Sequence, residues 1–286
     1  NPINSIGGNA DWERLASAMH ALFCFSKATG NDLYKGTAQK SFSFLEKYIF
    51  TISNLSLNVR LGTLSYLARS SLLNNRSHLD KISNFLYLNW EKIKFHPITA
   101  ANLATTFALI TSSGNKNYLS ESVRLAETVW IDFEKNKNFE NTESALYPEL
   151  AYTFKALHRL TNEDIYQTRA DLVKDWLISK QLENGAFAAT SNSSFCYSRG
   201  TGKIFEVLAA SYINNEVAVQ RSYKWLSNMQ YTEQNTYFIE PNLRNKFIGG
   251  LRHDYVNTEA WIDGAAHFLL GISRIMSKHH DPEIDS

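Results

Sequence analysis

The stretch Ala156–Phe187, "ALHRLTNEDIYQTRADLVKDWLISKQLENGAF", decides the fold class of this chain. Apolar residues recur at helical spacing on both sides of the turn "LTNED", and a second turn, "ENGAF", ends the stretch. The pattern predicts a helical hairpin whose second helix ends in Trp-Leu, followed by Gln. "KWLSNMQ", at Lys224–Gln230, repeats that ending.

The same alternation runs along the whole chain. Helices that start near 10, 57, 98, 143, 201 and 257 are rich in small residues, and those that start near 32, 77, 117, 163 and 216 carry more charge. We interpret the first class as inner helices, buried on all sides, and the second as outer helices with one wet face. Six inner helices predict closure into a ring. The predicted helices are 10–28, 32–52, 57–73, 77–93, 98–112, 117–136, 143–160, 163–181, 201–213, 216–230 and 257–277.

The hairpin at Ala156–Phe187 and the segment "GGLRHDYVNTEAWIDGAAH", Gly249–His267, resemble the repeats of the α/α-toroid superfamily. That superfamily includes six-hairpin glycosidases and uronate lyases, and also the terpenoid-cyclase and protein-prenyltransferase group. The resemblance implies an all-α fold, an (α/α)6 toroid of about six hairpins, over residues 1–286 as a single domain. It is specific for the fold and not for the chemistry, because one fold hosts many functions.

The composition narrows the classes of partner. Lys and Arg total 29 and Asp and Glu total 28, so a nucleic-acid partner or an anionic membrane surface is not expected. Buried thiols are favoured over a disulfide for Cys24 and Cys196, which lie among apolar or aromatic neighbours. We expect a soluble protein, either cytoplasmic or secreted or periplasmic after processing. The sequence is also compatible with additional domains in a longer chain.

The expected site lies at the N-terminal ends of the inner helices. In a ring of hairpins these ends share one face, where free N–H groups and helix dipoles favour anions. Two long loops, Glu183–Gly200 and Thr232–Tyr255, belong to that face and contain Tyr, Phe, Arg and Gly. Long loops in compact domains are usually functional or disordered, and this composition does not indicate disorder.

The last inner helix carries the leading catalytic candidates. Glu259, Asp263 and His267 are spaced by four residues, which predicts one helical stripe with the two carboxylates about 5–6 Å apart. Like charges at that separation push one pKa up, as glycoside hydrolysis requires. His253 and Tyr255 are candidates for an acid or base in a lyase.

Each candidate also has a structural interpretation. Asp254 is equally suited to cap a helix, and Glu259 to interact favourably with the helix dipole in the first turn. A histidine in the position of His267 is more often a hydrogen-bonded core residue than a catalyst. Asp263 is hardest to dismiss, because a buried carboxylate in mid-helix needs a partner or a role. The predicted substrate contacts come from the loops and from the starts of the inner helices: Arg252, Asp254, Tyr197, Arg199, Trp12, Trp261, Tyr147 and Glu149.

The weaker lumen candidates are Asp11, Glu13, Asn58, Arg60, His96, Tyr152 and Lys203. No cofactor motif is complete, and no metal is expected, because the three residues of the stripe would span about 12 Å. The sequence therefore predicts a carbohydrate-active enzyme, a glycoside hydrolase or a uronate lyase, with a small-molecule or oligosaccharide substrate. Two alternatives stay open: an isoprenoid-type enzyme with a deep apolar cavity, and a binding or scaffold domain without catalysis.

Overall fold

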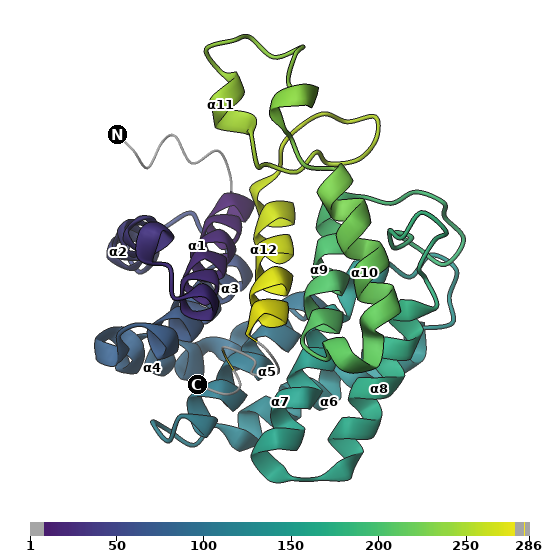
Figure 1. The fold of residues 1–286 in the computed structure, drawn as a ribbon. Helices are drawn as coiled ribbons and strands as arrows, with labels where there is room; N and C mark the ends of the chain where they lie inside the picture. Colours follow the sequence, from purple (N-terminus) through teal and green to yellow (C-terminus); the bar gives the residue numbers. More distant parts are fainter. Residues whose placement is uncertain (1–8, 278–282, 284–286) are drawn as a thin grey trace.

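Six helices form the inner layer of the computed structural model, which describes residues 9–277 and residue 283. Each packs against the next, and the last packs against the first, so that the layer is a closed ring (Figure 1). The ring consists of α1 Asn9–Thr29, α3 Leu57–Leu73, α5 Pro97–Ser112, α7 Pro148–Thr161, α9 Ser198–Ala209 and α12 Ile262–Met276.

Small residues allow these inner helices to approach closely. A Cβ added to Gly202 of α9 would stand 3.2 Å from the backbone oxygen of Gly264 in α12. A Cβ added to Gly271 would stand 2.3 Å from the ring of Phe205. Contacts this short require shifts of the neighbouring atoms, so glycine is needed where α9 and α12 meet.

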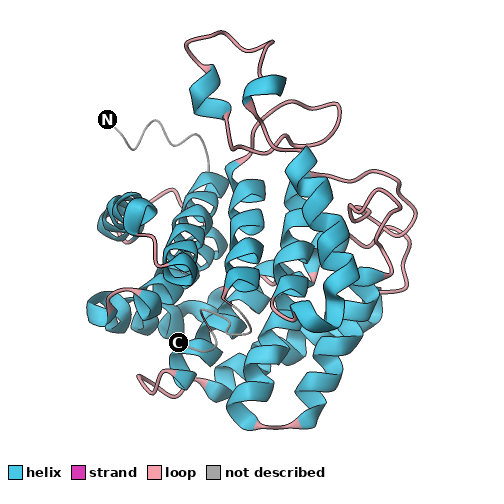
Figure 2. Cartoon of the chain, viewed as in Figure 1, coloured by secondary structure: helices cyan, strands magenta, loops and turns pink. Residues whose placement is uncertain are grey.

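An outer layer follows the inner one in sequence. Each outer helix packs against the inner helix that precedes it, and within the described residues no outer helix follows α12 (Figure 1). In the described part of the chain the regular secondary structure is helical, and strand pairing is limited to isolated bridges (Figure 2). The outer helices are α2 Lys35–Ile49, α4 Leu79–Asn89, α6 Leu119–Asn136, α8 Asp164–Ile178 and α10 Tyr212–Asn228.

All eleven predicted helices are present, and the predicted 57–73 matches α3 residue for residue. The predicted starts of α2, α9 and α10 differ by three or four residues, and two starts are wrong by five. α7 begins at Pro148 rather than 143, and α12 begins at Ile262 rather than 257, because irregular backbone precedes both. The four-residue helix α11, Arg244–Phe247, was not predicted.

The two long loops meet on one face, as expected. The backbone N–H of Ser198 donates to the backbone oxygen of His253 at 2.7 Å, which ties the start of α9 to the loop before α12. We call this face, with the N-terminal ends of the inner helices, the mouth. Cys24 and Cys196 are both buried and form no disulfide, which confirms the thiol prediction. No helix in the described part of the chain is both long and apolar enough to cross a bilayer.

Candidate active site

Asp263, in the first turn of α12, lies at the centre of the mouth and is 3% exposed. Its Oδ2 lies 3.0 Å from Nε of Arg199 and 3.6 Å from Nε of Arg14. Its Oδ1 accepts a hydrogen bond from the backbone N–H of Gly264 at 3.0 Å. Two guanidinium groups and a helix N-terminus therefore stabilise a negative charge on this carboxylate.

Glu13, in α1, provides a second carboxyl with a different environment. Its carboxyl packs against Gly62 of α3, where an added Cβ would stand 2.6 Å from Oε1. Burial raises the pKa of Glu13; Lys203 and Arg199 lower it, and the charge of Asp263 raises it. The net direction is upward, so the protonated form of Glu13 persists to higher pH than that of an ordinary glutamate.

Cations dominate the rest of the polar lining of the mouth. Burial lowers the pKa of Lys203 to about 8, and the charge of Arg199 lowers it as well, whereas Glu13 and Asp263 raise it. Burial also lowers the pKa of His96, with Lys203 as the next cause. Ammonium and guanidinium groups that gather at one face favour an anionic ligand.

Aromatic rings flank this charged centre. The ring of His253 stacks on Tyr197 with 5.6 Å between centroids and lies 4.5 Å from the ring of Trp261. The guanidinium of Arg14 lies 4.9 Å from the Trp261 ring centroid. The structure thus brings Asp263, Arg199, Tyr197, His253 and Trp261 together, as the sequence predicted in part.

Glu259 does not share a helical stripe with Asp263, so this prediction is wrong. It precedes α12 in an exposed loop, where its Oε2 accepts a hydrogen bond from Nε1 of Trp261 at 3.0 Å. The reason is local. Arg252 and Ala260 form an isolated bridge, and the N–H of His253 donates to the backbone oxygen of Glu259, so this backbone is extended rather than helical.

The loop residues around Glu259 have mixed placements. Asp254 is buried and accepts hydrogen bonds from the N–H groups of Val256 and Asn257, each at 2.7 Å, so it shapes the loop. Arg252 donates from Nη2 to the backbone oxygen of Asn228 at 3.1 Å. Tyr255 is 57% exposed and packs edge-on against Trp225.

Two predicted substrate contacts belong to the core, and this corrects the expectation for both. Trp12 is 4% exposed and stacks on Phe44 with centroids 5.8 Å apart. Tyr147 is fully buried, and its hydroxyl donates to Oδ2 of Asp132 at 2.8 Å. Neither side chain offers a surface to a ligand at the mouth.

Comparisons with known proteins match this architecture. No protein-family model and no curated protein matches the chain. Among solved structures, a possible member of the GH105 family from Salmonella enterica serovar Paratyphi A is 11% identical with a TM-score of 0.66, over 95% of this chain and 85% of that chain. A possible GH105 member from Klebsiella pneumoniae is 9% identical with a TM-score of 0.66, over 94% and 83%.

A glycoside hydrolase from family 105 of C. acetobutylicum is 10% identical, with a TM-score of 0.64 and coverage of 96% of both chains. The chain has the (α/α)6 toroid fold. At such low identity the likeness establishes the fold alone, and the chemistry of this toroid has to be argued from its own residues.

The lumen of the toroid is narrow below the mouth. A cavity of about 20 Å³, room for one or two water molecules, is bordered by Lys203, Glu149, Glu206 and His267 among others. A larger, mostly apolar pocket of about 440 Å³ lies between α10 and α12 and is bordered by Val219, Tyr223, Ile272, Ile275 and Met276 among others.

Among the titratable residues inside the lumen, the sequence indicated Glu149, His267 and Lys203 but not Arg69 and Glu206. Glu149 pairs with Arg69 at 3.0 Å, and burial raises the pKa of Glu149 although Arg69 lowers it. His267 is buried with Nδ1 2.6 Å from Oε2 of Glu206, which confirms the prediction of a satisfied core histidine. A charged residue in the middle of a small-residue helix was the available signal for Arg69 and Glu206.

Proposed function

We propose that this chain is a carbohydrate-active enzyme, a glycoside hydrolase that acts on an acidic sugar at the mouth of a single toroid domain over residues 1–286. One observation carries the proposal: two carboxyls share the mouth in different environments, Glu13 partly buried with a raised pKa and Asp263 between two guanidinium groups. Glycoside hydrolysis uses such a pair, one carboxyl protonated and one ionised. The likeness to structures described as GH105 members supports this choice.

The roles follow from the two environments. Glu13 is the general acid that protonates the leaving oxygen, because its raised pKa keeps the proton available. Asp263 is the ionised partner that activates water or stabilises the developing positive charge. Arg14, Arg199 and Lys203 favour a sugar that carries a carboxylate.

The rings of Tyr197, His253 and Trp261 provide faces for the C–H groups of a sugar ring. Arg252 and Tyr255, farther along the same loop, are proposed to contact substrate beyond the cleaved bond. A lyase is the main alternative chemistry, and it differs in its product, because elimination creates a carbon–carbon double bond whereas hydrolysis consumes water.

The test is turnover of acidic and neutral oligosaccharides by the purified chain and by Asp263→Asn and Arg199→Met. We expect hydrolysis of the acidic substrates, a loss of about 10²–10⁴-fold in kcat for Asp263→Asn, and a raised KM for Arg199→Met. Glu163→Gln is the control, because Glu163 is exposed and lies next to the outer helix α8, outside the mouth. Activity of Asp263→Asn within twofold of wild type would refute the assignment.

A binding domain without catalysis gives a different outcome. An acidic sugar at about 100 times its Kd would stabilise the fold by roughly 2.7 kcal/mol without turnover. Stabilisation that Arg199→Met abolishes, with no product formed by wild type, would support binding and reject the enzyme.

A further inference from the structure

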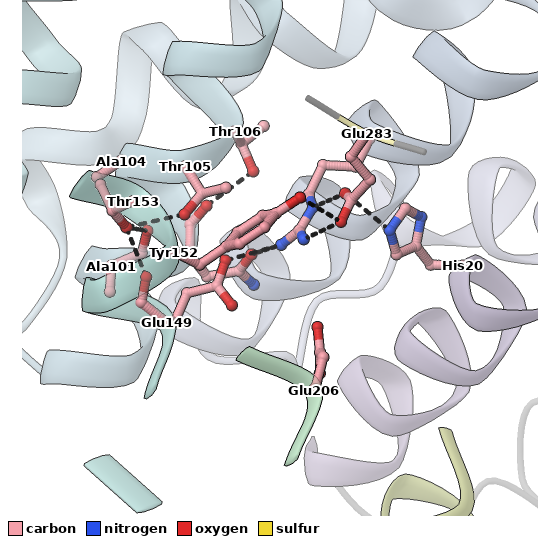
Figure 3. Close-up of polar contacts among 12 residues, drawn as sticks. His20, Ala101, Ala104, Thr105, Thr106, Glu149, Tyr152, Thr153, Glu206 and Glu283 are labelled. Atoms are coloured by element: carbon pink, nitrogen blue, oxygen red, sulfur yellow. Dashed lines mark hydrogen bonds and ion pairs between the residues drawn. The ribbon is translucent and has the colours of Figure 1, made fainter. Parts of the chain in front are cut away.

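A second polar cluster lies deeper in the ring, in addition to the mouth. Figure 3 shows Glu283 with its carboxylate directed toward His20 on one side and toward Tyr152 on the other. Four side chains from four different inner helices surround that carboxylate. We call them the floor cluster: His20 of α1, Arg69 of α3, Tyr152 of α7 and Arg274 of α12.

The floor cluster contacts both oxygens of Glu283. Arg69 donates from Nε to Oε1 at 2.6 Å and from Nη2 to Oε2 at 2.8 Å, a two-pronged contact. Oε1 also lies 2.9 Å from Nε2 of His20. Oε2 accepts from Nη2 of Arg274 at 3.0 Å and from the hydroxyl of Tyr152 at 3.2 Å. Paired donors on a planar carboxylate are the geometry with which arginine recognises carboxylic acids.

The ring itself orients these donors, independently of Glu283. Nη1 of Arg69 is held by Oδ1 of Asn102 at 3.1 Å and by Oε1 of Glu149 at 3.0 Å. Nη1 of Arg274 donates to the backbone oxygen of Glu206 at 2.9 Å. Each arginine therefore keeps one edge of its guanidinium fixed by the ring while the other edge receives the carboxylate, as in a preorganised binding site.

The chemistry of the cluster selects an anion. His20, Cys24 and Glu283 offer ligand atoms within 4.8 Å of one another, a spacing that would suit a metal ion. However, two guanidinium groups contact the same carboxylate, and their charges oppose a cation there. Removal of Glu283 would leave Arg69 and Arg274, both at most 5% exposed, without this counter-charge.

We propose that the floor cluster is a carboxylate-binding site of the toroid, which the chain's own Glu283 fills. Any small carboxylic acid presents the same two oxygens, so it takes the site when Glu283 no longer supplies them. In the wild-type chain the tethered Glu283 has the advantage of an intramolecular ligand, and free acids do not displace it at moderate concentration. This proposal is independent of the chemistry at the mouth.

The test is chemical rescue of Glu283→Ala in the full chain. We expect its Tm to fall by about 5–10 °C in sodium chloride, because two buried cations lose a counter-charge. Sodium formate or acetate at equal pH and ionic strength should raise that Tm by about 3 °C once it reaches ten times its Kd. Wild type and the exposed-site control Glu240→Ala should respond alike to both salts. Equal melting of Glu283→Ala in chloride, formate and acetate would overturn the proposal.

Glu283→Gln keeps the test decisive if the alanine variant does not fold. It preserves the shape of Glu283 and removes only the charge. A Tm within about 1 °C of wild type would show that the cluster needs no carboxylate and would overturn the proposal, whereas a loss of about 5 °C or more supports it. Zinc provides a further arm. If zinc stabilises wild type and Cys24→Ser abolishes the effect, the cluster is a metal site and the proposal is wrong.

Discussion

At the scale of single residues, the mouth contains two carboxyl groups whose neighbours give them different environments. Asp263 is paired with Arg199 at 3.0 Å and capped by a backbone N–H. Glu13 packs against Gly62, where burial raises its pKa. The first environment stabilises a negative charge by ion pairing and the second penalises it by desolvation, which is the basis for proposing Glu13 as the general acid.

Glu13→Gln tests that division at the same scale. Glu13 acts only while protonated, so the wild-type rate should fall as the pH rises through its raised pKa. The glutamine variant should lose about 10²–10⁴-fold in kcat and should no longer show this alkaline decline. Rate measurements across pH 4–9 on both proteins check this. An unchanged profile in the variant would assign the titration to another group.

The raised pKa of Glu13 also affects stability, and the pH dependence of its contribution is opposite to that of an ion-paired carboxylate. The favourable protonated state of Glu13 is available below its unfolded pKa and is lost as the pH rises through its folded pKa. Glu13→Gln should therefore melt no lower than wild type above neutral pH. This result also separates a catalytic loss from unfolding in the kinetic experiment.

At the scale of elements, the sequence predicted helix positions better than helix ends. The inner and outer classes emerged from small-residue content, which is why α3 was placed to the residue. The start of α12 was missed, and with it the pairing of Glu259 and Asp263. The extended bridge of Arg252 with Ala260 is a contact between backbone groups, which leaves no periodic signal in side chains.

The site was predicted in part for the same physical reason. Asp263 stood out as a carboxylate in the middle of a predicted small-residue helix, and Arg199 as a cation in the long loop before another. Arg14 and three members of the floor cluster, His20, Arg69 and Arg274, did not, because their roles depend on which helices the closed ring places side by side. Glu283 contacts His20 across 263 positions of sequence, a proximity that local spacing does not encode.

The seam between α9 and α12 gives an element-scale prediction. Gly271→Ala would place a methyl 2.3 Å from the ring of Phe205, which is fully buried and has little freedom to move. Overpacking of this kind should destabilise the fold by about 1–3 kcal/mol, measured by urea unfolding. Gly36→Ala in α2, where nothing lies within 4 Å of the added methyl, is the matched control and should be neutral or stabilising. Equal stability of the two variants would mean that the seam is loosely packed.

At the scale of the whole molecule, the floor cluster links helices that the sequence order keeps apart. Side chains of α1 and α7 contact Glu283 in Figure 3, and Arg69 of α3 and Arg274 of α12 contact it as well, so four of the six inner helices share one polar network. The closure of the ring between α1 and α12 is also backed by packing of the two helices along their lengths. Loss of the network should therefore lower the stability of the whole fold rather than that of one hairpin.

Acid unfolding tests that whole-molecule role. Burial alone would raise the pKa of Glu283, but the charges of Arg69 and His20 outweigh it and hold the pKa well below its ordinary value of 4.5. A depressed folded pKa stabilises the fold above the unfolded pKa, and that stabilisation is lost as the pH falls below it. Wild type should exceed Glu283→Gln by about 3–5 kcal/mol in free energy of unfolding near pH 7, and the gap should begin to narrow below about pH 4.5 and shrink further as the pH approaches the folded pKa of Glu283. Urea titrations from pH 7 to pH 3 measure the gap directly, and a gap that persists undiminished at pH 3 would show that ionised Glu283 does not hold the ring together.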